Sequence, residues 1–235
     1  MQKDTNWPIF PIETPARILL SGADYRGLRP DLSVSEGERI SAGQIVFADR
    51  KRRWIRIPSP VSGKVVSIER GPRRTLKHIE IEVSDGPETT RPSVDVAAKG
   101  APARQALIDA GLWSAIRQRP FDSVSDPDIP PKAILVTAMF SDHTAPSLAE
   151  VMAHSQTEDD FVIGLQFVSN LAACPAVLCH VRGDVLPVPK NTGLKQVAFG
   201  LDHSDRFVGT HVRKIAPAST DAPVWYVNWQ DVVAI

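Results

Sequence analysis

The chain has 235 residues, which is enough for one large domain or two modest ones. It carries 27 Lys and Arg against 27 Asp and Glu, so its formal net charge is zero, and no global field draws it to nucleic acid or to an anionic membrane. The apolar segment at residues 7–11 is short and broken by prolines, and no apolar run elsewhere reaches the roughly 20 residues that span a bilayer. We therefore expect a cytoplasmic protein with no direct membrane span and no nucleic-acid partner.

The only two cysteines are Cys174 and Cys179. Two are too few for a disulfide framework or a structural zinc site, and no other Cys or His stands at ligand spacing to them. We expect both to pack as small apolar residues, and we predict no metal site.

The first half of the chain is typical of short β-strands. Residues 1–15 are rich in proline and polar groups and predict an extended arm, and residues 16–20 (ARILL) predict a buried strand. Residues 29–68 hold short apolar runs separated by glycine turns, and residues 77–83 alternate between apolar and polar side chains. The pattern predicts a small barrel of short strands.

Within this half, the segment IPSPVSGKV resembles the hairpin-flanking segment of biotinyl and lipoyl carrier domains, which have the barrel-sandwich hybrid fold. In those carriers, the modified lysine stands eight residues before the second proline of the PSP segment, which is Arg52 here. A guanidinium stays protonated and cannot accept an acyl group. We expect a lipoyl-like scaffold without covalent biotin or lipoate. The alternative, modification of Lys51, requires a hairpin that is one residue longer.

The pattern changes after a turn-rich segment at residues 84–92, which we expect to be the domain boundary. Residues 102–111 predict a short helix that ends at Gly111. The near-continuous apolar run at residues 133–138 (AILVTA) predicts a strand buried on both faces.

Two helices are predicted next, one that begins near Pro146 and one over residues 158–172. A second buried strand follows at residues 176–181 (AVLCHV). Strand, helix and strand at this spacing predict a right-handed βαβ unit and a parallel, Rossmann-like sheet. Residues 207–212 and 224–235 again carry β signals.

The expected fold is therefore mixed α/β (α+β), with three parts. Residues 1–90 form the arm and the barrel-sandwich hybrid module, and residues 91–206 form the Rossmann-like module. Residues 207–235 have too few apolar positions for a core of their own, so we expect this β segment to pack back on the N-terminal module.

Seven segments, in order, cover nearly the whole chain: ADYRGLRP (23–30), SEGERISAGQIVFADRK (35–51), PVSGKVVSIERG (60–71), AGLWSAIRQRPFDSV (110–124), AILVTAM (133–139), VGTHV (208–212) and WYVNWQDVVAI (225–235). Together they resemble the N-terminal portion of the A subunit of the sodium-translocating NADH:quinone reductase. The resemblance implies a peripheral subunit on the inner membrane, in a respiratory complex that couples sodium transport to the reduction of a quinone such as ubiquinone. It also implies the other subunits of that complex as partners.

The chain departs from the family pattern in two places. The family's full-length subunit continues beyond QDVVAI into a β-grasp-like region and a helical tail, so we expect this chain to be either part of a longer protein or a natural short relative. Family members also carry a PHPAG-like segment before GTH, where this chain has LDHSD at residues 201–205.

The family resembles the flavin-binding subunits of related NADH-oxidising complexes, which have a glycine-rich phosphate loop at the position of Gly111 and Leu112. In this chain no glycine follows over residues 113–120. Without bare backbone N–H groups, the loop cannot approach a phosphate closely. We expect the fold to be retained and the flavin site to be lost.

Four side chains stand at the former cofactor position: Trp113, Arg117, Arg119 and Phe121. Two aromatic rings and two guanidiniums would suit a quinone ring or an anionic group. The alternative, which we favour, is that the aromatic rings fill the emptied pocket and the arginines pair with local carboxylates such as Asp122.

His143 follows the strand at residues 133–138, where open α/β sheets bind their ligands, and Asp142 stands beside it. No serine or cysteine stands in a nucleophile-elbow motif. A solvated loop histidine is therefore the favoured interpretation over a catalytic one.

The predicted hairpin of the barrel is strongly cationic, with Arg50, Lys51, Arg52 and Arg53 beside Trp54. The cluster would suit an acidic surface on a partner protein. A hairpin that is simply solvated explains the same charges equally well.

Three functions remain open. The leading hypothesis is a cofactor-free peripheral subunit, not catalytic alone, that serves assembly or the docking of quinone and partner subunits. The second is a free-standing small-molecule binding protein that uses the vestigial flavin cleft. The third is a carrier protein modified on Lys51.

Overall fold

The structure, a computed structural model, describes residues 13–25, 27–84, 94–140, 142, 145–190, 192–200 and 202–235. The expected linker and His143 lie outside the described residues, apart from Ser84. The chain divides into two compact units. Among the described residues, the first comprises 13–84 and 106–114, and the second comprises 94–105 and 115–235.

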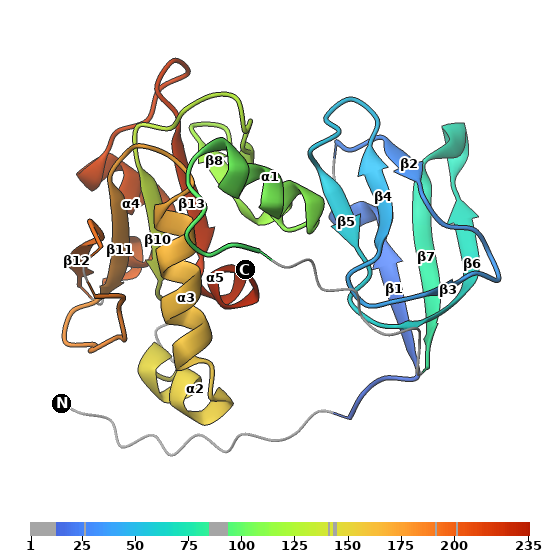
Figure 1. Cartoon of the computed structure of the whole chain (residues 1–235), viewed down its shortest axis with the longest axis horizontal. Helices are drawn as coiled ribbons and strands as arrows, with labels where there is room; N and C mark the ends of the chain where they lie inside the picture. Colours follow the sequence, from blue (N-terminus) through green and yellow to red (C-terminus); the bar gives the residue numbers. More distant parts are fainter. Residues whose placement is uncertain are drawn as a thin grey trace. The chain divides into compact units, whose positions relative to one another are not determined.

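The first unit contains two antiparallel sheets (Figure 1). One has four strands in the order β1-β7-β6-β3, and the other has three in the order β2-β4-β5. Their bounds are β1 Arg17–Ser21, β2 Pro30–Leu32, β3 Arg39–Ile40, β4 Ile45–Asp49, β5 Arg56–Pro58, β6 Gly63–Arg70 and β7 Leu76–Val83, with short 3-10 turns η1 Gly22–Asp24 and η2 Pro72–Arg74. This confirms the expected module of short strands.

Glycine turns connect these strands as the sequence predicts. Gly37 and Gly43 have φ angles of +84° and +86°, in the left-handed region that glycine adopts without steric cost. The core between the sheets is formed by β-branched and aromatic side chains that are fully buried: Ile40, Val46, Phe47, Ile55, Val65, Ile79 and Ile81.

Residues 106–114 group with this unit, although we expected them in the second domain. Their contacts explain the difference. The Arg56 guanidinium lies 3.2 Å from the Asp109 carboxylate. A Cβ on Gly111, whose φ is +76°, would lie only 2.8 Å from the Ile45 Cδ1 atom. The segment therefore packs directly on the β4 and β5 strands.

The second unit has a six-stranded sheet in the order β12-β11-β10-β13-β8-β9. The strands are β8 Arg117–Arg119, β9 Ser123–Val124, β10 Ile134–Ala138, β11 Ala176–Val181, β12 Lys195–Phe199 and β13 Val224–Asn228. The helices are α2 Leu148–Ser155, α3 Glu158–Ser169, α4 Val208–Ile215 and α5 Trp229–Ala234, with 3-10 turn η4 His203–Arg206; α1 Ala101–Asp109 and 3-10 turn η3 Trp113–Ala115 precede the sheet in the chain.

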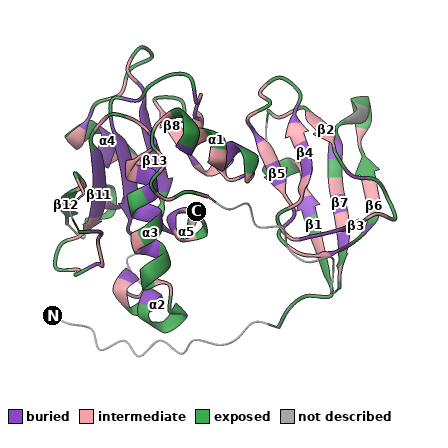
Figure 2. Cartoon of the chain, viewed as in Figure 1, coloured by how far each residue is buried: buried purple, intermediate pink, exposed green. Residues whose placement is uncertain are grey.

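Strands β12, β11, β10 and β13 are parallel, and β8 is antiparallel to β13. All of β10 and most of β11 and β13 are buried (Figure 2). Helix α3 runs along one face of the sheet (Figure 1), and on the other face Val212 and Ala216 pack against Leu135. The predicted parallel βαβ unit is therefore confirmed. From β10 the sheet extends in one direction through β11 and β12 and in the other through β13, so the strand order changes direction between β10 and β13.

The predicted placement of the last 29 residues is wrong. Residues 208–215 form helix α4 rather than a strand, and residues 207–235 group with the second unit rather than with the first. Instead β13 lies inside the second sheet, between β10 and β8. The physical reason is the burial of four consecutive side chains, those of residues 224–227. Consecutive side chains of a strand point to opposite faces of a sheet, so all four are buried only in an interior strand that is covered on both faces.

Helix α3 packs against α5 through Gly164. A Cβ at this position would lie 2.0 Å from the Val232 backbone oxygen, so a side chain does not fit without displacing the helix. This close approach accounts for a glycine inside a helix, where glycine is otherwise unfavourable by about 1 kcal/mol.

Candidate functional site

The four residues of the expected cleft are distributed over both units. Trp113 groups with the first unit, and Arg117, Arg119 and Phe121 belong to the second. The Trp113 side chain is fully buried in η3, a tight turn directly after Gly111 and Leu112. At this position the indole is part of the packed interior.

Arg117 and Asp122 fix the connection between β8 and β9. The Arg117 Nε atom donates to the Asp122 Oδ1 atom at 3.2 Å, and its Nη2 atom donates to the Asp122 backbone oxygen. Tyr226 on β13 donates its hydroxyl hydrogen to the same carboxylate. Asp122 itself has a φ of +56°, and three hydrogen bonds from two residues hold this backbone conformation, which non-glycine residues rarely adopt. Arg117 thus makes the local pairing that the sequence raised as the alternative.

These contacts change the acidity of both partners. Partial burial tends to raise the pKa of Asp122, but the hydrogen bond from Tyr226 and the charge of Arg117 outweigh it and lower that pKa below its ordinary value. Burial and the neighbouring carboxylate raise the pKa of Tyr226. At neutral pH the carboxylate is therefore ionised and the phenol protonated, which is the state that the hydrogen bond requires.

Arg119 and Phe121 differ in exposure. The Arg119 guanidinium carbon lies 5.7 Å from the centre of the Tyr226 ring, in a cation–π contact. Phe121, in contrast, is 76% exposed. The connection between β8 and β9 therefore presents an uncovered aromatic ring on a backbone that its neighbours hold in place.

The cationic hairpin joins β4 to β5, and most of its charges are paired. Arg52 lies 2.8 Å from Asp49, whose side chain is only 2% exposed. Arg53 and Arg50 both approach Asp31, at 2.8 Å and 3.8 Å. The Asp49 carboxylate also accepts from the Arg29 backbone N–H at 2.8 Å.

Arg52 therefore has a structural role, and Lys51 is exposed, as are Arg50 and Arg53. In the part of the chain that the structure describes, no ion pair joins the Lys51 side chain. Trp54, three residues further along the chain, is half-buried. An exposed lysine at a hairpin tip is accessible to a partner or to a modifying enzyme.

Around the C-terminal end of β10, the described neighbours of His143 are organised by an arginine that the sequence did not reveal. Arg206 is buried, and its Nη1 atom donates to the backbone oxygens of Phe140 at 3.1 Å and Asp142 at 3.0 Å. Trp229 of α5 packs edge-on against Phe140, with ring centres 5.6 Å apart. These contacts hold Phe140 and Asp142 at the end of the strand.

His211 on α4 is a second residue that sequence reasoning missed. It is fully buried, and its Nε2 atom lies 2.7 Å from the Asp205 backbone oxygen, so Nε2 carries the hydrogen. The Asp205 carboxylate accepts from Lys214 at 2.6 Å, and the Phe199 ring lies 4.2 Å from the imidazole. Burial lowers the pKa of His211, although Asp205 acts in the opposite direction. In the sequence, the only feature that drew attention to His211 was its position in the segment VGTHV (208–212), one of the segments that resemble the family.

Neither cysteine has the character of a reactive thiol. Burial raises the pKa of Cys174, and it raises the pKa of Cys179 to about 12. Among the described residues, no group of three or more His, Cys, Asp or Glu side chains is arranged to hold a metal ion. No helix in the described ranges has both the length and the apolar character that crossing a bilayer requires.

Two family models match the chain. The NqrA N-terminal barrel-sandwich hybrid domain matches residues 5–84, and the NqrA second alpha/beta domain matches residues 98–235. The first match covers the strands of the two antiparallel sheets, and the second covers the strands of the six-stranded sheet.

Similar proteins include the A subunits of the Na(+)-translocating NADH-quinone reductases of Neisseria meningitidis serogroup C (35% identical over 223 residues) and Rhodopirellula baltica (37% identical over 227 residues). Each match covers 93% of this chain and 49% of the relative, so the chain spans about half the length of the curated relatives it matches. On these matches the chain belongs to the NqrA family, of which it carries the N-terminal barrel-sandwich hybrid domain and the second alpha/beta domain.

Proposed function

We propose that this chain is a cofactor-free, peripheral docking subunit of a sodium-translocating NADH:quinone reductase complex. Its membership of the NqrA family supports the complex, because curated relatives carry the name of that enzyme's A subunit. The observation that carries the docking role is Phe121, an exposed aromatic ring on a connection that Arg117, Asp122 and Tyr226 hold in place.

A ring in this position is suited to partner binding. Exposed aromatic side chains that become buried in a partner pocket frequently dominate the energy of an interface. A backbone that is already ordered loses little conformational entropy on association. The ionised Asp122 follows Phe121 in the chain and pairs with the Arg117 guanidinium, and the two would form a polar rim.

The absence of a flavin is part of the proposal. The segment after Gly111 forms a tight turn with a buried indole, and residues 113–120 contain no glycine. A phosphate cradle needs adjacent backbone N–H groups that a ligand can approach. Both features support a segment that packs the interior instead of holding a nucleotide phosphate.

Replacing Phe121 tests the docking role. Phe121→Ala should weaken co-purification with the membrane subunits of the reductase from the same organism by about thirtyfold, which corresponds to an interface residue worth about 2 kcal/mol. Val185→Ala is the matched control, because Val185 is 87% exposed in the same unit and should have no effect. Wild-type affinity in both Phe121→Ala and Phe121→Asp, or no binding to those subunits by the unaltered chain, would overturn the proposal.

The finer parts of the proposal have separate readouts. The purified chain should have the mass of its bare sequence and no flavin absorbance after gel filtration. A mass increment on Lys51 would favour the carrier alternative, and retained flavin would contradict the loss of the cofactor site.

Quinone docking should quench tryptophan fluorescence when ubiquinone is titrated, with Trp113→Phe as control because the chain has five tryptophans.

A further inference from the structure

The first unit contains a cavity that neither the family resemblance nor the docking role explains. It has a volume of about 980 Å³ and is lined by four arginines, Arg29, Arg50, Arg70 and Arg73, together with Tyr25. They come from three separate stretches of the chain: the segment after η1, the β4–β5 hairpin, and the turn between β6 and β7. In a chain of zero net charge, this is a local concentration of positive charge.

The backbone beneath these arginines is fixed by contacts between the three stretches. The Arg50 N–H donates to the Arg29 backbone oxygen at 2.9 Å. Gly22 lies so close to β7 that a Cβ would stand 1.9 Å from the Leu76 oxygen. In the third stretch, the Gly71 N–H donates to the Thr75 oxygen at 2.8 Å. The guanidiniums therefore project from an ordered frame.

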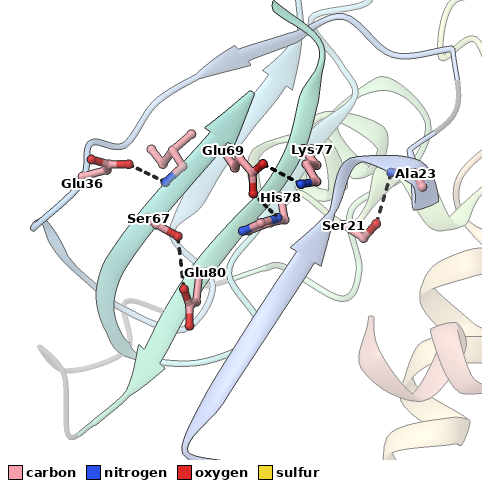
Figure 3. Close-up of polar contacts among 9 residues, drawn as sticks. Ser21, Ala23, Glu36, Ser67, Glu69, Lys77, His78 and Glu80 are labelled. Atoms are coloured by element: carbon pink, nitrogen blue, oxygen red, sulfur yellow. Dashed lines mark hydrogen bonds and ion pairs between the residues drawn. The ribbon is translucent and has the colours of Figure 1, made fainter. Parts of the chain in front are cut away.

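The carboxylates nearest in sequence are mostly bound to cations that do not line the cavity. Asp49 pairs with Arg52. Glu69 lies 2.6 Å from Lys77 and 3.6 Å from His78. Figure 3 shows Glu69 with these two partners. Asp31 lies 2.8 Å from Arg53 and 3.8 Å from Arg50.

Two of the lining arginines are available to a ligand. Within the described residues, neither the Arg29 nor the Arg73 side chain makes an ion pair. The cavity therefore retains positive charge that the protein itself does not neutralise.

The backbone conformation of Arg73 is a second, independent observation on this cavity. Its φ of +55° and ψ of +26° place it in the left-handed region, where glycine is favoured and an arginine is unfavourable. Unfavourable backbone conformations of this kind concentrate at binding sites. The backbone conformation of Arg73 therefore supports a binding role for this turn.

We propose that this arginine-lined cavity binds the polyphosphate group of a soluble small molecule, such as a nucleoside di- or triphosphate. Guanidiniums bind phosphate oxygens through paired, charge-assisted hydrogen bonds, and four of them match an anion with several charges better than a single carboxylate. The volume fits a molecule of nucleotide size. Tyr25 also lines the cavity, and burial raises the pKa of its hydroxyl, which keeps it protonated at neutral pH.

Calorimetric titration of the whole chain with inorganic tripolyphosphate and with ATP tests this proposal. Both should bind, and binding should weaken as NaCl is raised. Arg29→Gln should reduce the affinity at least tenfold, the effect expected for the loss of a charge-assisted hydrogen bond. Arg39→Gln is the matched control, because Arg39 is exposed on β3 of the same unit but does not line the cavity, and it should change the affinity less than threefold.

Arg73→Gly separates binding from folding. It relieves the backbone conformation, so the melting temperature should stay the same or rise while the affinity falls at least tenfold. Four results would overturn the proposal: no binding at millimolar tripolyphosphate, equal loss in Arg39→Gln, unchanged affinity in Arg73→Gly, or binding only to vesicles that contain phosphatidic acid. The site lies in the first unit and Phe121 in the second, so this test and the docking test fail independently.

Discussion

His211 shows what one buried side chain contributes to the second unit. Its Nε2–H donates to the Asp205 oxygen, so the neutral ring leaves Nδ1 without a hydrogen. Nδ1 is buried and has no hydrogen-bond partner among the described residues. Protonation would therefore place a new N–H in a site that offers it no acceptor, which is the physical reason that burial lowers the pKa of His211.

This arrangement predicts how stability depends on pH. The folded pKa lies below the ordinary value of 6.5, so the unfolded chain takes up the proton first as the pH falls. The stability that neutral His211 contributes is present above pH 6.5 and is lost as the pH falls through the folded pKa. His211→Gln keeps a donor for Asp205 but does not titrate. It should cost about 1 kcal/mol at pH 8 and flatten the loss of stability below pH 6.5, measured by urea unfolding. An equally steep loss in the variant would contradict this role.

At the scale of elements, the α3–α5 contact depends on one missing side chain. Gly164→Ala adds a methyl group where the Val232 oxygen would be 2.0 Å away, so α3 or α5 must shift. The gain in helix propensity is about 1 kcal/mol, and the cost of overpacking a core is typically about 1–3 kcal/mol. We expect a net loss of stability of up to about 2 kcal/mol, measured by chemical unfolding.

The exposed Gln166 on the same helix provides the control. Gln166→Ala changes helix propensity without meeting α5 and should leave the unfolding free energy within about 0.5 kcal/mol. A Gly164→Ala variant more stable than the wild type would contradict this prediction, because it would show that α3 and α5 move apart at little cost in free energy.

The elements that the sequence predicts correctly are those with a strong local signal. Strands β10 and β11 are continuous apolar runs, and the glycine turns of the first unit have the φ angles that glycine permits. Helix α4 has the sequence pattern of a strand because Val208, Thr210 and Val212 alternate with polar or small residues. Strand β8, with the sequence RQR, carries no apolar pattern, and its pairing with β13 on one side and β9 on the other makes it a strand.

The same limit applies to the candidate sites. The pairing of Arg117 with Asp122 is local, five residues apart, and the sequence predicts it as an alternative. The contacts of Arg206 join residues more than 60 positions apart. The arginine cavity likewise joins three stretches that are distant in sequence. Residue types alone do not reveal such groupings, because the register and order of the strands decide them.

For the whole molecule, the interior position of β13 predicts the effect of deleting residues 224–235. The deletion removes the strand between β10 and β8 and the helix that packs on α3. Buried faces of β10 would become accessible to water, so we expect insoluble protein or strong binding of a hydrophobic dye. Asn228→Ala, at an exposed position in the same strand, should remain soluble. A soluble deletion variant with an unchanged melting temperature would rule out the need for this strand.

The strand order also has a consequence for how the protein is made. Arg119 of β8 pairs with Val224 of β13, roughly 100 residues further along the chain. A ribosome adds about 5–20 residues per second, so β8 and β9 leave the exit tunnel about 5–20 seconds before their partner exists. During that interval β8 has an unpaired edge, which other nascent chains can bind. Its polar sequence, RQR, makes that edge a poor template for aggregation, and the arginines of this hairpin thus also protect the protein before it has folded.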